Sequence, residues 1–207
     1  MATIRVPFEQ IKDTLRSGDL VFYRATGRRW SLGWIVERLI SWWQHSPYIH
    51  VGILEMKNGV PWVIDMSAAQ GGGREEPLSG DLADYDVDFY RVSRPVNGRV
   101  GFDAEKGKIE SSEYLFDEEF ILLKVKELCK KKYSWRANLR IMLERWFGYD
   151  KLSNDEATVR AANCATVIES AFNDCGFDLC PRMSPNFATP DRLARSALLD
   201  YLFTISD

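Results

Sequence analysis

Short apolar runs, typical of strands, mark four places in the first half of the chain. Branched and aromatic residues crowd each run, and turn-forming residues bound it. Asn58-Gly59 separates two of the runs, and this dipeptide favours the positive φ angles of a tight hairpin. The pattern predicts strands at 20–23, 48–56, 61–66 and 87–92, with the second and third paired antiparallel.

One-sided apolar stripes, typical of amphipathic helices, fill much of the rest. Asn163 is a favourable N-cap, Gly176 a favourable C-cap, and Thr189 before Pro190 suits a helix start. The pattern predicts helices over 7–16, 30–44, 118–132, 135–147 and 163–176, and a short one after Thr189.

Two segments lack a regular pattern. Residues 67–84 hold three consecutive glycines and several carboxylates, so we expect a long loop there, either a surface segment or a lid near a site. Residues 94–117 are polar and predict an irregular connection or insertion. The order of elements predicts one α+β domain over 1–207, with helices packed on a small antiparallel sheet.

The composition narrows the function classes. The chain has 207 residues, of which 45% are apolar and 28% charged, as expected of a globular domain. Its formal net charge of −3 does not resemble the basic footprint of a nucleic-acid-binding protein. No apolar stretch is long enough for a membrane span, and the first residues lack a signal-peptide core, so we expect a cytoplasmic location.

The four cysteines do not have the spacing of a zinc site. Cys175 and Cys180 are close in sequence, but no second pair of ligands follows them. We therefore expect reduced thiols, no metal and no cofactor.

Cys164 and His50 are the candidate nucleophile and base. Cys164 follows the N-cap Asn163, and a thiol at a helix N-terminus lies at the positive end of the helix dipole, which favours a thiolate. His50 lies in the apolar run 48–53, and the chain has only one other histidine, His45. The alternative roles are a buried structural thiol and an imidazole hydrogen-bonded within a sheet.

The hairpin suggests an acid for the imidazole. Pairing about Asn58-Gly59 puts Asp65 near His50 on the adjacent strand, where it can accept an imidazole N–H. A register slip of one residue would turn Asp65 away. Glu55 is the rival acid, but its odd spacing from His50 puts it on the other face of a regular strand.

Four segments resemble a known enzyme family when taken in order. They are GDLVFY at 18–23, ISWWQHSPYIHVGI at 40–53, NCATVIESAFNDCGF at 163–177 and MSPNFATPDRLARS at 183–196. Together they are similar to the circularly permuted NlpC-type papain-like cysteine hydrolases, a branch related to the lecithin:retinol acyltransferase group. The resemblance covers most of 17–196, apart from about 94–117.

The resemblance implies a permuted papain-like core with Cys164 as nucleophile, His50 as base and Asp65 as the orienting residue. The family usually has a small polar residue just before the histidine, whereas this chain has Ile49. The backbone N–H of Cys164 is the expected first oxyanion donor. Tyr48 is a further candidate donor.

We therefore expect a papain-like thiol hydrolase or acyltransferase that cleaves an amide or ester bond through a thioester. Its partner would be a small molecule, a peptide or an acyl lipid, with Tyr48, Trp43 and Trp62 as candidate substrate contacts. The alternative is a non-catalytic module that binds a lipid or peptide in the same cleft.

Overall fold

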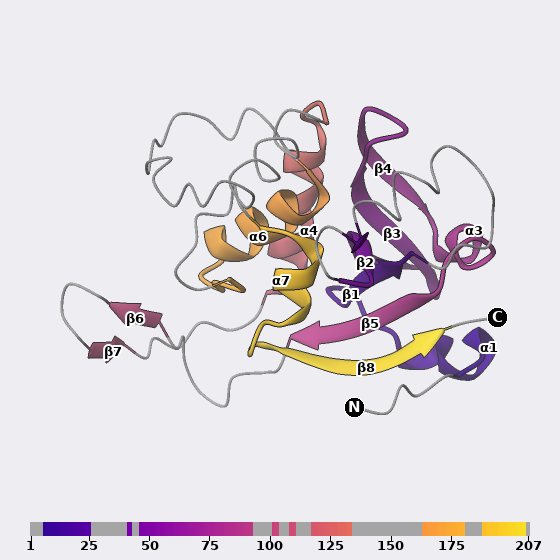
Figure 1. Cartoon of the computed structure of the whole chain (residues 1–207), viewed down its shortest axis with the longest axis horizontal. Helices are drawn as coiled ribbons and strands as arrows, with labels where there is room; N and C mark the ends of the chain where they lie inside the picture. Colours follow the sequence, from indigo (N-terminus) through magenta and orange to yellow (C-terminus); the bar gives the residue numbers. More distant parts are fainter. Residues whose placement is uncertain are drawn as a thin grey trace.

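Six antiparallel strands form the main sheet of the computed structural model (Figure 1). The structure describes residues 6–25, 41–42, 46–92, 117–133, 163–180 and 188–205, and the backbone of 101–103 and 108–110. The strand order is β4-β3-β2-β1-β5-β8. The strands are β1 (Leu20–Arg24), β2 (Tyr48–Lys57), β3 (Val60–Ser67), β4 (Gly72–Pro77), β5 (Val87–Val92) and β8 (Leu199–Ile205).

The predicted hairpin between β2 and β3 is present. Asn58 and Gly59 have φ angles of 51° and 77°, so both supply the left-handed backbone that a two-residue turn needs. Pairing runs from Lys57 opposite Val60 to Ile53 opposite Ile64. This register decides which side chains of the two strands share a face.

Each face of the sheet carries its own apolar core. Figure 1 shows α4 (Glu118–Cys129), α6 (Cys164–Asp174) and α7 (Pro190–Ala194) on one side of the sheet. On the other side lie α1 (Phe8–Ile11), which runs on into a 3-10 turn at Lys12–Thr14, and α3 (Leu78–Leu82). Side chains of Phe22, Val51 and Ile53 pack toward α6, whereas Val21, Tyr23 and Leu54 pack with α1 and α3. The mixed α+β class predicted from the sequence is therefore present.

Three expectations about the elements need correction. The segment 67–84 is not one long loop, because it contains β4 and α3. The chain continues after α7 into β8, which the sequence pattern did not predict. The segment 94–117 is not wholly irregular, because β6 (Gly101–Asp103) and β7 (Lys108–Glu110) pair within it.

The predicted helix over 135–147, and that over 30–44 apart from the helical pair 41–42, lie outside the described residues. Within the described part of the chain, no helix is long and apolar enough to cross a membrane.

Candidate active site

A β-bulge at Ile49 determines where His50 points. On β1, Tyr23 pairs with His50 and the next residue, Arg24, pairs with Tyr48, so β2 has one residue more than its partner at this point. Tyr48 and Val51 pack on the α6 side of the sheet, whereas Ile49 packs on the side of α1 and α3. His50 contacts the Tyr23 ring on that same side, at 5.2 Å between ring centroids. The bulge thus puts two consecutive residues on one face and re-aims the imidazole.

Asp65 reaches His50 across a glycine. Continuing the β2–β3 register by one step puts Asp65 opposite Gly52, so His50 is its diagonal neighbour on the same face. A Cβ on Gly52 would come within 3.2 Å of the Asp65 Cβ. Because glycine leaves this space open, Asp65 Oδ2 lies 3.0 Å from His50 Nε2. The sequence expectation that the two residues share a face holds, with a register two residues different from direct opposition.

Cys164 is the first residue of α6, and a capping box fixes this helix start. The Asn163 side chain accepts from the Thr166 N–H at 2.9 Å, and the Thr166 hydroxyl accepts from the Asn163 N–H at the same distance. The predicted N-cap is therefore confirmed. α6 packs against β2 and β3, which puts the start of the helix beside the His50 strand.

His50 joins the thiol and the carboxylate. Burial of the imidazole opposes its protonation, but the charges and hydrogen bonds of Cys164 and Asp65 outweigh burial and raise the pKa of His50 to about 10. Burial likewise opposes ionisation of Asp65, yet His50 and Arg74 hold its pKa below the usual value. Both shifts favour the charged forms of His50 and Asp65.

The other three thiols lie in different surroundings. Burial raises the pKa of Cys129 and of Cys180 to about 12 in each case, and that of Cys175 to about 11. Nearby carboxylates add to each shift. These three thiols are therefore protonated at neutral pH. A thiol that reacts quickly with an alkylating reagent at neutral pH can thus be told apart from them.

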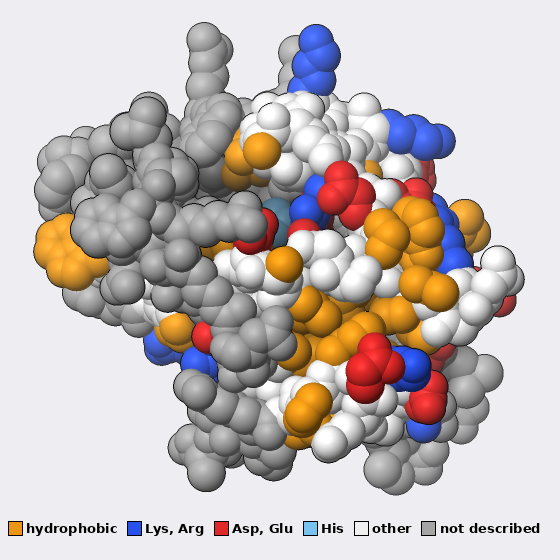
Figure 2. Space-filling model, turned by 90° about the vertical axis from the view of Figure 1, so that its right-hand side faces the viewer, with side chains coloured by type: hydrophobic (Ala, Val, Ile, Leu, Met, Phe, Trp, Pro, Cys, Tyr) orange, Lys and Arg blue, Asp and Glu red, His pale blue; other side chains and the backbone are white. Residues whose placement is uncertain are grey.

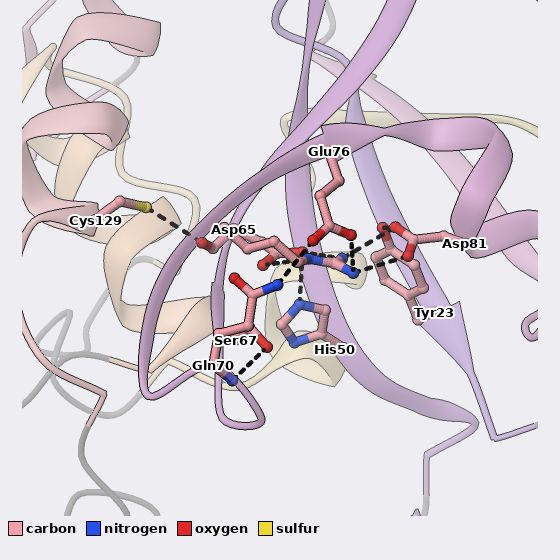
Figure 3. Close-up of polar contacts among 9 residues, drawn as sticks. Tyr23, His50, Asp65, Ser67, Gln70, Glu76, Asp81 and Cys129 are labelled. Atoms are coloured by element: carbon pink, nitrogen blue, oxygen red, sulfur yellow. Dashed lines mark hydrogen bonds and ion pairs between the residues drawn. The ribbon is translucent and has the colours of Figure 1, made fainter.

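Further polar side chains lie behind Asp65 (Figure 3). Arg74 on β4 donates to both oxygens of the Asp65 carboxylate, from Nε at 3.2 Å and from Nη2. Asp81 of α3 accepts from the other edge of the same guanidinium, at 2.8 Å from Nη1. The Tyr23 hydroxyl donates to Asp81. Sequence reasoning missed Arg74 and Asp81 because both lie in the segment expected to be a loop.

The candidate substrate contacts have separate locations. Tyr48 is buried, and its hydroxyl donates to Asp88 and contacts the Tyr90 hydroxyl. Trp62 lies toward the hairpin turn, where the Lys57 ammonium sits 4.6 Å from its ring centroid. Trp43 lies outside the described residues. The structure thus brings Cys164, His50 and Asp65 together, and brings neither Tyr48 nor Trp62 into the same set of contacts.

The two remaining candidates from the sequence do not join this cluster. Glu55, the rival acid, pairs instead with Lys126 of α4 at 2.6 Å and with Lys57 at 3.3 Å. His45 lies outside the described residues.

The candidate site is partly open to solvent. The side chain of His50 is 23% exposed, whereas Cys164 is buried. Figure 2 shows a small histidine surface among acidic and basic side chains, above a gathering of hydrophobic side chains. The imidazole is therefore accessible to a small reactant.

Comparison with known proteins supports the fold. No family model matches the chain, and no curated protein matches it. Among solved structures, the chain is similar to the crystal structure of the metalloprotein yiiX from Escherichia coli O157:H7. The two share 15% sequence identity with a TM-score of 0.56, and the match covers 93% of this chain and 98% of that one. At this identity the likeness concerns the fold alone.

Proposed function

We propose that the chain is a papain-like cysteine hydrolase or acyltransferase that acts on an amide or ester bond. The observation that carries the proposal is the position of His50, which contacts the Asp65 carboxylate at 3.0 Å and interacts electrostatically with Cys164 at the start of α6. A nucleophile, a base and an orienting group are the parts that covalent acyl transfer requires.

The reaction follows from these three groups. The Cys164 sulfur, its proton on His50, attacks the carbonyl carbon of the substrate. His50 then gives that proton to the departing amine or alcohol as the bond to the carbonyl carbon breaks, leaving a thioester on Cys164. Water, or a second alcohol or amine, loses a proton to His50 and attacks the thioester, which releases the acyl product and the thiol. Asp65 holds the imidazole throughout, and the helix-start amide of Cys164 faces the developing oxyanion.

The similarity to a metalloprotein raises the question of a metal at this site. Within the described part of the chain, no group of three histidine, cysteine or carboxylate side chains is placed to hold a metal ion. The Asp65 carboxylate is also engaged by the Arg74 guanidinium. Among the described residues no set fits a metal centre, so no step is assigned to one.

The first test is trapping of the acyl-enzyme. The full-length protein, with and without EDTA, is mixed with p-nitrophenyl esters of two to sixteen carbons, quenched in acid and weighed by mass spectrometry. We expect a mass increase equal to the acyl group in the wild type, located on Cys164 by peptide mapping and absent in Cys164→Ala. Cys175→Ala, which removes a half-buried thiol at the other end of α6, is the matched control and should still be acylated.

A second readout does not depend on the choice of substrate. Iodoacetamide should label Cys164 at neutral pH at least tenfold faster than the three thiols of raised pKa, and His50→Ala should remove most of this advantage. Labelling of Cys164 at the rate of Cys175, together with no acyl adduct, would overturn the proposal. A lipid that copurifies with such an inert protein would then favour a binding module.

A further inference from the structure

Five side chains at the candidate site contact one another in a closed ring. Asp65 joins His50 to Arg74, Arg74 joins Asp65 to Asp81, and Asp81 accepts from Tyr23. The Tyr23 ring returns to the His50 ring at 5.2 Å, with a tilt of 53° between the planes. Four strands and α3 each supply one member, so the ring connects elements that are far apart in the sequence.

The Asp65 carboxylate has few restraints of its own. Its side chain is fully buried, so water does not hold it. Within the described part of the chain, His50 and Arg74 are the groups that contact its oxygens. Since His50 is the group to be oriented, Arg74 is what fixes the carboxylate.

The contact geometry suits this role. Arg74 meets both carboxylate oxygens through Nε and Nη2, and such a two-point contact fixes the plane of a carboxylate as well as its position. Asp81 restrains the guanidinium in turn, at 2.8 Å from Nη1 and 3.0 Å from Nη2. The more exposed Glu76 lies farther away, at 3.7 Å from Nη1. The side chain of Arg74 is only 15% exposed, so few other orientations are open to it.

We infer that Arg74 is a positioning residue, whose two-point contact with Asp65, backed by Asp81, holds the acid where it orients His50. The inference rests on the proposed function for its catalytic meaning. Arg74→Lys would keep the positive charge but lose the planar guanidinium that binds a carboxylate at two points. The geometry therefore predicts that a positive charge alone does not hold Asp65 in place.

The loss of Arg74 can change the pKa of His50 in one of two opposite directions, depending on what Asp65 does. If Asp65 leaves its place, His50 loses an anionic partner and its pKa falls toward the ordinary value. If Asp65 stays, the loss of a nearby positive charge raises the pKa of His50 further. The direction of the change in the pKa of His50 therefore shows whether Arg74 holds Asp65 in place or only contributes a nearby positive charge.

The experiment is an NMR titration of the histidines in the full-length protein, with His50→Gln used to assign the two signals. We compare the wild type with Arg74→Met, Arg74→Lys and Asp81→Asn, and use Asp65→Asn to define complete loss of the acid. We expect the pKa of His50 to fall by at least one unit in both Arg74 variants and by less in Asp81→Asn. No change or a rise would overturn the inference.

Arg91→Met is the matched control. Arg91 on β5 forms a similar two-point pair with the buried Asp19, at 2.7 and 2.8 Å, but does not contact the ring. Its loss should lower the melting temperature and leave the His50 titration unchanged. A fall in the pKa of His50 as large as that in Arg74→Met would show a general effect of destabilisation and overturn the inference.

Cys164 labelling gives a second readout. We expect Arg74→Met and Arg74→Lys to slow labelling at neutral pH by about tenfold, as one unit of pKa corresponds to a factor of ten. A wild type with unreactive Cys164 would contradict the proposed function, and the titration would still test the positioning role. A reactive wild type with unchanged Arg74 variants would contradict the positioning role alone.

Discussion

Two small features of β2 allow His50 to contact Asp65. The bulge at Ile49 turns His50 toward the face that carries Asp65, and Gly52 leaves room for the carboxylate to cross diagonally. In a regular strand His50 would share the face of Tyr48, which packs toward α6. The chemistry of the candidate site thus depends on a backbone irregularity and on a missing side chain.

Gly52→Ala tests the second feature. The new Cβ would lie 2.6 Å from Val63 Cγ1 and 3.2 Å from the Asp65 Cβ, so one of them must move. We expect a stability loss of about 1–3 kcal/mol in urea unfolding, as is typical of overpacking, and a weaker contact between Asp65 and His50. Cys164 labelling at neutral pH should slow accordingly.

Gly80→Ala is the control for this substitution. A Cβ at Gly80 would meet nothing within 4 Å. It should leave labelling and stability unchanged. Equal labelling rates in Gly52→Ala and the wild type would show that Asp65 has another route to His50.

At this scale the sequence identified the three residues of the candidate site better than the residues that hold them in place. Cys164, His50 and Asp65 could be found because a helix cap, an apolar run and a hairpin turn each mark one of them. Arg74 carries no such mark, since glycine and glutamate beside it are poor strand formers. It is held in β4 by pairing with β3, a long-range interaction that local pattern does not report.

Helix α6 carries Cys164. The helix is more deeply buried than its one-sided apolar pattern suggests. The capping box fixes its first turn, and Gly176, with a φ angle of 86°, ends it. Every residue from Cys164 to Phe172 is buried, including Glu169. Burial raises the pKa of Glu169 to about 8, with a further contribution from Asp178. The helix therefore holds a neutral acid at neutral pH.

Glu169 makes the stability of the protein depend on pH. The unfolded chain releases this proton near pH 4.5, whereas the folded protein keeps it until about pH 8. The folded state therefore binds more protons in this range, and this group makes stability fall as the pH rises from about 5 to 8. Glu169→Gln should flatten that fall, by a few kcal/mol at most.

Urea unfolding at pH 5, 6, 7 and 8 measures this effect. The exposed Glu119→Gln on α4 is the control and should follow the wild-type curve. A wild-type stability that rises over this range, or a Gln variant with the same slope, would contradict the assignment.

The elements themselves were predictable to different degrees. β5 has the predicted bounds, and α7 starts at the predicted N-cap, because strong local signals mark both. β8 was missed because Leu199–Ile205 alternates poorly and lies at the edge of the sheet, where pairing with β5 determines its conformation. Edge strands of this kind depend on tertiary contacts rather than on their own pattern.

The whole sheet is tied together by a second buried carboxylate, separate from the candidate site. Asp88 of β5 is fully buried and accepts from Arg24 of β1, Tyr48 of β2 and Thr204 of β8. Four strands thus meet at one side chain. This role also explains why Tyr48, a candidate substrate contact by sequence, has its hydroxyl engaged within the sheet.

Asp88→Asn should destabilise the whole protein. The amide keeps one acceptor and loses the charge, so Arg24 and at least one hydroxyl lose their partner. The expected loss is about 3 kcal/mol in urea unfolding, as when one member of a buried pair is removed. Asp200→Asn, an exposed position on β8, is the control and should change stability little. A loss below about 1 kcal/mol in Asp88→Asn would show that the cluster does not hold the strands together.

The packing of α6 on β2 and β3 also determines when, during synthesis and folding, Cys164 meets His50. During synthesis the chain emerges from its N-terminus, so His50, Asp65 and Arg74 leave the ribosome long before Cys164. Until α6 docks, the thiol has neither imidazole nor helix start beside it, and it is as unreactive as any free cysteine of a nascent polypeptide. Cys164 therefore gains its imidazole partner only after α6 has been synthesised and has docked on the sheet.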